Sequence, residues 1–195
     1  MVGKISAVLQ AGLLSAAIAF GGASAQDNWS YSGGNGPQAW HQLSPGNSIC
    51  RTGQRQSPIN IEGTDPVIMH RLITDYRVAP LELKHSGHSV GMNYSSRSLL
   101  RVGRKFFSLK SLSFHTPAEH TVAGESFPLS IQFLHRGPSG EWAVIETLIK
   151  EGSENVAAQE FLENFPLEAG QSTKLPKTLV NARDLMPADK SYYRY

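Results

Sequence analysis

Two segments in the middle of the chain alternate polar and apolar side chains, the pattern of a β-strand whose two faces differ. Because alternate side chains of an extended segment share a face, one face of the first segment carries Ser111, Ser113 and His115. The second segment has a polar face with Ser130, Gln132 and Leu134, and a uniformly apolar face with Phe127, Leu129, Ile131 and Phe133. We predict that the apolar face packs in the core and that the polar side chains form the wall of a site.

The rest of the chain adds further short strands and one helix. Leu81–His85 and Ser89–Asn93 read as a hairpin around a glycine, and further β-prone runs cover Arg97–Val102, Phe106–Leu112 and Glu141–Lys150. Glu154–Phe165 has helical spacing, with Ser153 as the expected cap, Pro166 as the end, and an inward face of Val156, Phe161, Leu162 and Phe165. The pattern therefore predicts a mainly β fold.

The first 25 residues read as an export signal. Lys4 supplies a short positive region, an apolar stretch follows, and Ala23-Ser24-Ala25 fits the small-x-small cleavage pattern. A membrane anchor is the alternative, but the apolar stretch is shorter than the roughly 20 residues that span a bilayer. We expect cleavage before Gln26, one domain over residues 26–195, a periplasmic or secreted location, and no membrane span after the signal is removed.

Composition excludes several classes of function. The net charge is +2, or +1 without Lys4, and no basic run or basic helix face is present, so nothing favours nucleic-acid binding. The chain contains none of the glycine-rich phosphate or dinucleotide loops, the HExxH zinc motif or the GxSxG nucleophile motif. The charge pattern is that of an ordinary soluble surface, and no protein partner is indicated.

Several stretches together resemble the α-class carbonic anhydrases. They are Trp29–Pro37, Trp40, Cys50, Gly53–Ile61 and the two alternating segments, and the similarity extends over nearly all of residues 28 to 195. The aromatic lead, Trp29, Tyr31 and Trp40, needs a packing surface and is expected to be structural. The resemblance implies a large, twisted, mostly antiparallel sheet with a few peripheral helices. It also implies that the family's C-terminal strands are missing from this sequence.

The resemblance places the family's three zinc ligands at Ser113, His115 and Gln132. Neither a serine hydroxyl nor a carboxamide approaches imidazole as a zinc donor, and a catalytic zinc site needs three protein ligands. The residues that would accept hydrogen bonds from the ligands in the family are Ser111 and Ser130 here, so that support is changed as well. We predict that zinc, the family's cofactor, is not held by this chain.

Other family roles fall on identifiable residues. By resemblance, His88 occupies the proton-shuttle position, which has no function without an acidic metal-bound water, and Leu134 and Val144 line the pocket for carbon dioxide. Glu119 matches a glutamate that accepts a hydrogen bond from a threonine, and we expect it to lack this partner because the threonine belongs to the missing segment. His120 and His135 are not ligands in the family, and we expect them to be hydrogen-bonded within the scaffold.

Two side chains raise separate questions. Cys50 is the only cysteine, which in an exported protein indicates an intermolecular bridge or a lost partner. The resemblance implies that the partner lies in the missing segment, and a buried free thiol is the alternative. Glu146 interrupts an apolar face of its strand, so it must lie at an edge, be paired, or be costly to bury.

Three functions follow from these observations. The favoured one is a carbonic-anhydrase-like protein that is catalytically inactive, a pseudoenzyme or relic, because its zinc site is not intact. The second is an active carbonate dehydratase, a lyase that hydrates carbon dioxide to bicarbonate with an altered ligand set. The third is a zinc-less binding or scaffold module. Carbon dioxide and bicarbonate are expected ligands of this chain by resemblance only.

Overall fold

The computed structural model describes residues 29–94, 97–189 and 191–195, in two compact units that meet in sequence between Thr52 and Gly53. The predicted export signal, residues 1–25, lies outside the described residues and stays a prediction, as does the single domain over 26–195. Within the described part of the chain, every helix is too short or too polar to cross a bilayer.

The first unit consists of short helices and an aromatic cluster. Its helices are η1 (Gly33–Asn35), α1 (Trp40–Leu43), η2 (Pro45–Ser48) and α2 (Ile49–Thr52). The predicted aromatic lead packs on itself: Trp29 meets Tyr31 and Trp40 edge to face, with ring centroids 5.2 and 5.3 Å apart. Cys50 lies exposed on α2, so the alternative of a buried thiol is wrong.

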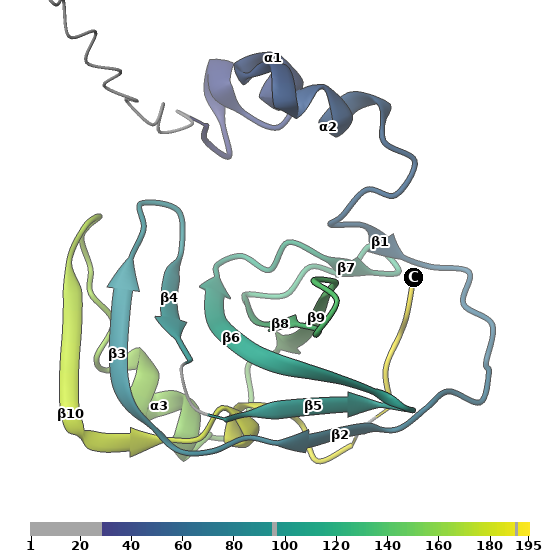
Figure 1. Cartoon of the computed structure of the whole chain (residues 1–195). Helices are drawn as coiled ribbons and strands as arrows, with labels where there is room; N and C mark the ends of the chain where they lie inside the picture. Colours follow the sequence, from purple (N-terminus) through teal and green to yellow (C-terminus); the bar gives the residue numbers. More distant parts are fainter. Residues whose placement is uncertain (1–28, 95–96, 190) are drawn as a thin grey trace, which may run out of the picture. The chain divides into compact units, whose positions relative to one another are not determined.

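The second unit is built around an eight-stranded antiparallel sheet (Figure 1). Its strands are β2 (Leu72–Asp75), β3 (Ala79–His85), β4 (Val90–Asn93), β5 (Leu99–Val102), β6 (Lys105–His115), β8 (Leu129–Arg136), β9 (Trp142–Ile149) and β10 (Ser172–Val180). The order is β10-β3-β4-β6-β5-β2, and β8 pairs with both β6 and β9. A separate parallel pair joins β1 (Asn60–Ile61) to β7 (Thr121–Val122). The predicted mainly β, antiparallel architecture is confirmed.

A bulge in β6 decides which side chains face the site. The pairing with β8 shifts between Leu109 and Ser111, which leaves one extra residue, Lys110, on β6. Since side chains alternate along a strand, one extra residue exchanges the two faces. Beyond the bulge Leu112 and Phe114 are buried, and Ser111, Ser113 and His115 therefore share the other face, as the alternation predicted.

The core lies on one face of the sheet, under a short helix. Ile131 and Phe133 of β8 are almost fully buried there, which confirms the predicted apolar face. Helix α3 (Val156–Leu162) packs on this face, where Phe161 of the helix and Phe165, which follows the helix, place their rings 5.5 and 4.9 Å from that of Phe114. The polar face of β6 and β8 therefore points away from α3.

The helix predicted over Glu154–Phe165 is present but shorter, because it spans Val156–Leu162 and ends before Pro166. The N-cap is Asn155, whose side-chain oxygen accepts a hydrogen bond from the Ala158 amide at 3.0 Å, and not Ser153. Val156 and Leu162, expected to face inward, are largely exposed. Two alanines of the helix pack against the core instead, namely Ala157 and Ala158.

Three strands, β2, β7 and β10, were not predicted from the sequence. Strand β10 forms an outer edge of the sheet beside β3, with a shift in register between Leu175 and Leu179 that accommodates Pro176. A 3-10 helix, η3 (Ala182–Leu185), follows it, and its cap Asn181 accepts a hydrogen bond from the Arg183 amide.

Candidate functional site

The register of β6, β8 and β9 brings the predicted site residues into one patch. Ser113 lies directly opposite Gln132, and Gln132 in turn lies opposite Glu146. His115 lies opposite Ser130, one step along the same face. Directly opposed side chains on neighbouring strands are close enough to interact. The three positions that the resemblance assigns to zinc ligands are therefore neighbours on one wall.

These three side chains bond to protein groups. His115 Nε2 is 3.1 Å from Ser113 Oγ, so the ring nitrogen and the hydroxyl share a hydrogen bond. The Gln132 amide donates to Glu119 Oε2 at 2.9 Å, and His115 Nδ1 lies 3.8 Å from the same carboxylate oxygen. His115 and Glu119 are mostly buried, with side chains 13% and 21% exposed. The four side chains form a continuous polar network from β6 to β8.

This donor set does not fit zinc. A zinc site needs lone pairs from imidazole, thiolate or carboxylate groups converging on one point. Of the three wall positions only His115 supplies such a group, and its Nε2 is engaged with Ser113. Gln132 directs its amide N–H, a donor, at Glu119. Across the described residues, no three His, Cys, Asp or Glu side chains are grouped as metal ligands would be.

Glu119 has a different partner from the one that the resemblance implied. We expected a carboxylate that had lost its threonine partner, and that expectation was incomplete, because the Gln132 amide now donates to it. The same substitution that removes an imidazole at position 132 thus supplies a hydrogen bond to Glu119. A part-buried carboxylate without a donor would be costly, so this bond stabilises the wall.

His88 and the two apolar pocket residues lie where their strands carry them. His88 is exposed in the turn between β3 and β4. It follows Gly87, whose φ is 103°. Leu134 and Val144 lie directly opposite each other on β8 and β9, and Leu134 also lies opposite Ser111. They continue the same face past Ser113 and Gln132, and Val144 is 55% exposed.

A second polar cluster lies beside the wall, and its members could not be recognised as partners from the sequence. The Glu146 carboxylate contacts His120 Nδ1, and both side chains are 11% exposed. On the other side of the ring, His120 Nε2 is 2.6 Å from the Tyr195 hydroxyl, which is 2.7 Å from Ser57 Oγ. Glu146 is thus paired with His120, and its position on an otherwise apolar face was the signal for such a partner.

His135 is fully buried and hydrogen-bonded through both ring nitrogens. Nε2 is 2.7 Å from the Tyr76 hydroxyl, and Nδ1 is 3.2 Å from the Ala143 carbonyl oxygen. Burial disfavours the charged imidazolium and lowers the pKa of His135 to about 4. Burial also raises the pKa of Tyr76, so this pair is neutral at pH 7. The predicted scaffold role of His135 is confirmed by its contacts.

Comparison with known proteins agrees with the sequence resemblance. Residues 35–195 match the sequence profile of the eukaryotic-type carbonic anhydrases. A carbonic anhydrase from Pectobacterium atrosepticum is 32% identical over 197 aligned positions, which cover the whole of this chain and 78% of that protein.

Solved structures share the fold. The α-carbonic anhydrase from Thermovibrio ammonificans, solved with the inhibitor sulfanilamide, superimposes with a TM-score of 0.82 at 32% identity, covering 87% of this chain and 75% of that one. Dioscorin, solved as a complex with ascorbate, superimposes with a TM-score of 0.73 at 28% identity, covering 85% of this chain and 72% of that one.

Proposed function

The chain belongs to the α-type carbonic anhydrase family, and we propose that it is a member that does not catalyse zinc-dependent hydration of carbon dioxide. The single observation that carries the proposal is the hydrogen-bonded set Ser113, His115 and Gln132 at the three ligand positions. The family's chemistry depends on zinc, which when bound lowers the pKa of a water molecule and so generates a hydroxide nucleophile near neutral pH. One imidazole with two neutral oxygen groups is a poor substitute for three imidazoles.

The network around these residues supports the proposal. A bound ion at this wall would require His115 to give up its bond to Ser113 and Gln132 to give up its bond to Glu119. Each loss leaves a part-buried polar group without a partner, at about 1–3 kcal/mol. The wall is thus stabilised in a form that competes with a metal ion.

The test is a stopped-flow assay of carbon dioxide hydration with excess zinc in the buffer. We expect the protein to give the rate of buffer alone, and the same rate after a chelator is added. A zinc-dependent rate above buffer would contradict the proposal and favour an active enzyme with an altered ligand set.

A zinc-less binding module is a second candidate. Its support is the intact polar wall, together with the similarity to dioscorin, a relative solved with ascorbate bound. We propose ascorbate as the first compound to test, by isothermal titration calorimetry of the wild type and of His115→Phe. Binding that His115→Phe abolishes would favour this candidate, and the absence of heat at millimolar ascorbate would remove its support.

We also propose that the protein is exported to the periplasm or the medium. The support is the signal-like pattern of residues 1–25. N-terminal sequencing of the protein from a periplasmic extract is expected to begin at Gln26, and a retained Met1 would contradict the proposal.

A further inference from the structure

Strand β9 has a free edge along its whole length. It pairs with β8 on one side, and within the described residues it pairs with no strand on the other. The Gly137 amide donates to the Glu141 carbonyl oxygen at 2.8 Å just before β9, so the odd-numbered residues of the strand bond to β8. The remaining residues point their N–H and C=O groups outward, and they are Trp142, Val144, Glu146 and Leu148. No described backbone group outside the β8–β9 pair bonds to them.

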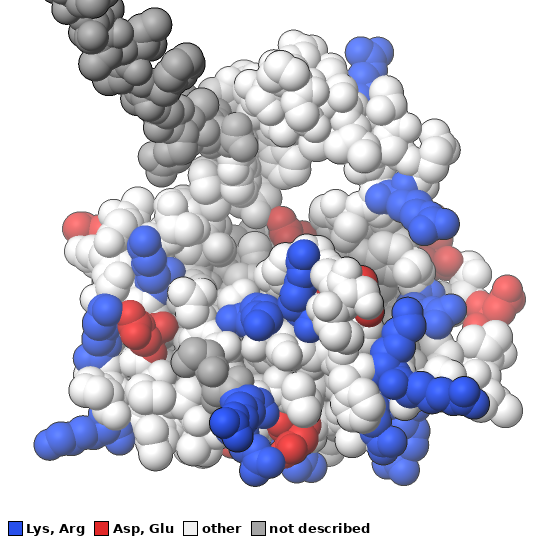
Figure 2. Space-filling view, in the orientation of Figure 1, with Lys and Arg blue, Asp and Glu red and all other residues white. Residues whose placement is uncertain are grey.

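The edge at β10 carries features that block the addition of a strand. Lys174 and Lys177 are exposed there, and Pro176, which has no N–H to donate, interrupts the strand. Figure 2 shows Lys and Arg side chains over the side of the sheet where Figure 1 places β10. Charged side chains and proline are common means by which proteins keep an edge strand from pairing.

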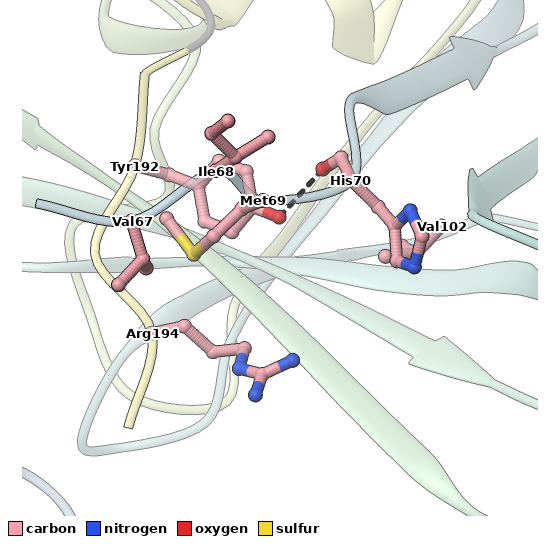
Figure 3. Close-up of a pocket in the computed structure, with 7 residues that line it drawn as sticks. All are labelled: Val67, Ile68, Met69, His70, Val102, Tyr192 and Arg194. Carbon is pink, nitrogen blue, oxygen red and sulfur yellow. Dashed lines mark hydrogen bonds between the residues drawn. The ribbon is translucent and has the colours of Figure 1, made fainter.

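The edge at β2 is short and its approach is held by another segment. β2 has 4 residues, and its exposed last residue, Asp75, forms an ion pair with Arg77. The Tyr192 hydroxyl donates to the His70 carbonyl oxygen at 2.6 Å, which ties the C-terminal segment to the residues that lead into β2 (Figure 3). A short, charged edge offers few groups to a new strand.

The edge at β9 has the opposite character. The strand is 8 residues long and contains no proline, lysine or arginine. Trp142 and Val144 are 56% and 55% exposed. On the other face of the strand, Ile145 and Ile149 are only partly buried against the core. A long, exposed and apolar edge is a ready template for another strand.

We propose that two copies of this chain join through β9, which pairs antiparallel with itself about a two-fold axis at Ile145. In this register Trp142 of one copy lies opposite Leu148 of the other, and Val144 lies opposite Glu146. All the outward-pointing residues are then used, which gives about eight backbone hydrogen bonds, two from each opposed pair. The interface is isologous and closed, so it yields a dimer and not a filament. It is independent of whether the protein binds zinc.

The side chains favour this register over the neighbouring ones. An axis at Glu146 would place two carboxylates opposite each other, and like charges that are directly opposed are destabilising. An axis at Val144 would leave the outward groups of Leu148 unused and would place Trp142 opposite Glu146. With the axis at Ile145, two isoleucines meet as a close pair beside the core. The strand is thus complementary to itself, which favours a second copy over an unrelated extended peptide.

Sedimentation equilibrium of the purified protein over a wide range of concentration is the first test. We expect a reversible equilibrium between monomer and dimer, with no larger species. Val144→Pro removes an outward N–H, twice in each dimer, and leaves the bonds to β8 intact. At about fivefold for each net hydrogen bond, the dimer should weaken by about 25-fold.

Ser172→Pro is the matched control for this substitution. The His85 amide donates to the Gln171 carbonyl oxygen, so the next residue of β10, Ser172, directs its N–H away from β3. It is exposed on an edge that we expect to stay unpaired. The Ser172→Pro variant should therefore dimerise like the wild type.

Disulfide cross-linking tests the register. At an opposed pair that is not hydrogen-bonded the Cα atoms lie about 4.5 Å apart, within the range that a disulfide spans. In a Cys50→Ser background, Ile145→Cys should therefore give a covalent dimer under mild oxidation. Thr147→Cys, which would lie opposite Ala143, should not. Circular dichroism checks that each variant is folded.

A monomer at every concentration overturns the proposal, and this outcome needs no variant. A dimer that Val144→Pro leaves unchanged also overturns it, because the interface would then lie elsewhere. Growth beyond a dimer would indicate head-to-tail pairing and would rule out the two-fold axis. Equal cross-linking at positions 145 and 147 would rule out the register.

Discussion

The buried imidazole of His135 should make the fold sensitive to mild acid. The folded protein holds the pKa of His135 at about 4, whereas an unfolded histidine titrates near 6.5. Between these two values the unfolded chain binds a proton that the folded chain excludes. The free energy of unfolding therefore falls as the pH drops through 6.5, and this contribution levels off below pH 4.

The size of the effect follows from the two pKa values. Each unit of difference corresponds to 1.36 kcal/mol, and the full difference is worth about 3 kcal/mol. Between pH 7 and pH 5, His135 alone should lower the free energy of unfolding by about 2 kcal/mol. Because the side chain is fully buried, solvent does not screen this contribution.

Urea unfolding at pH 7, 6 and 5, followed by circular dichroism, measures this change in the free energy of unfolding. The variant is His135→Gln, since a glutamine can still donate to the Ala143 carbonyl and bond to the Tyr76 hydroxyl. We expect the variant to lose about 2 kcal/mol less than the wild type between pH 7 and pH 5. His88→Gln, in an exposed turn, is the control and should behave like the wild type. Equal losses in the wild type and His135→Gln would refute the reasoning.

Three further changes test other parts of the structure. Ser113→His with Gln132→His places two imidazoles on facing strands beside His115. Once circular dichroism shows a folded sheet, we expect titration calorimetry to give about one zinc per chain. No zinc binding by the folded variant would count against the assigned ligand positions. Glu146→Leu removes the partner of a buried ring nitrogen and should lower the free energy of unfolding by about 1–3 kcal/mol, with Glu146→Gln less affected. Asn155→Ala removes the cap of α3 and should cost about 1 kcal/mol by urea unfolding; an unchanged midpoint would show that the cap contributes nothing.

The sequence predicted the strands that carry two distinct faces. Alternation along Leu129–Arg136 separates Ile131 and Phe133 from Gln132 because one face is buried under α3 and the other is not. Alternation did not predict β10, because Pro176, two lysines and a shift in register interrupt the two-residue period of this edge strand. It also misjudged the inner face of α3, where small alanines contact the core and Val156 does not.

The wall of the site could be predicted, and its partners could not. Ser113, His115 and Gln132 are identified by motif and face, because both are local properties of a strand. The pairing of Gln132 with Glu119, and of Glu146 with His120, depends on which strands become neighbours and in what register.

The central claim is that the wall formed by Ser113, His115 and Gln132 does not hold zinc. Its most direct test is the metal content of untagged protein, purified from zinc-supplemented cells, by plasma mass spectrometry. We predict well under one zinc per chain, since a single imidazole with a hydroxyl and an amide supplies too few donors. One zinc per chain, lost on mutation of His115 to phenylalanine, would contradict the account.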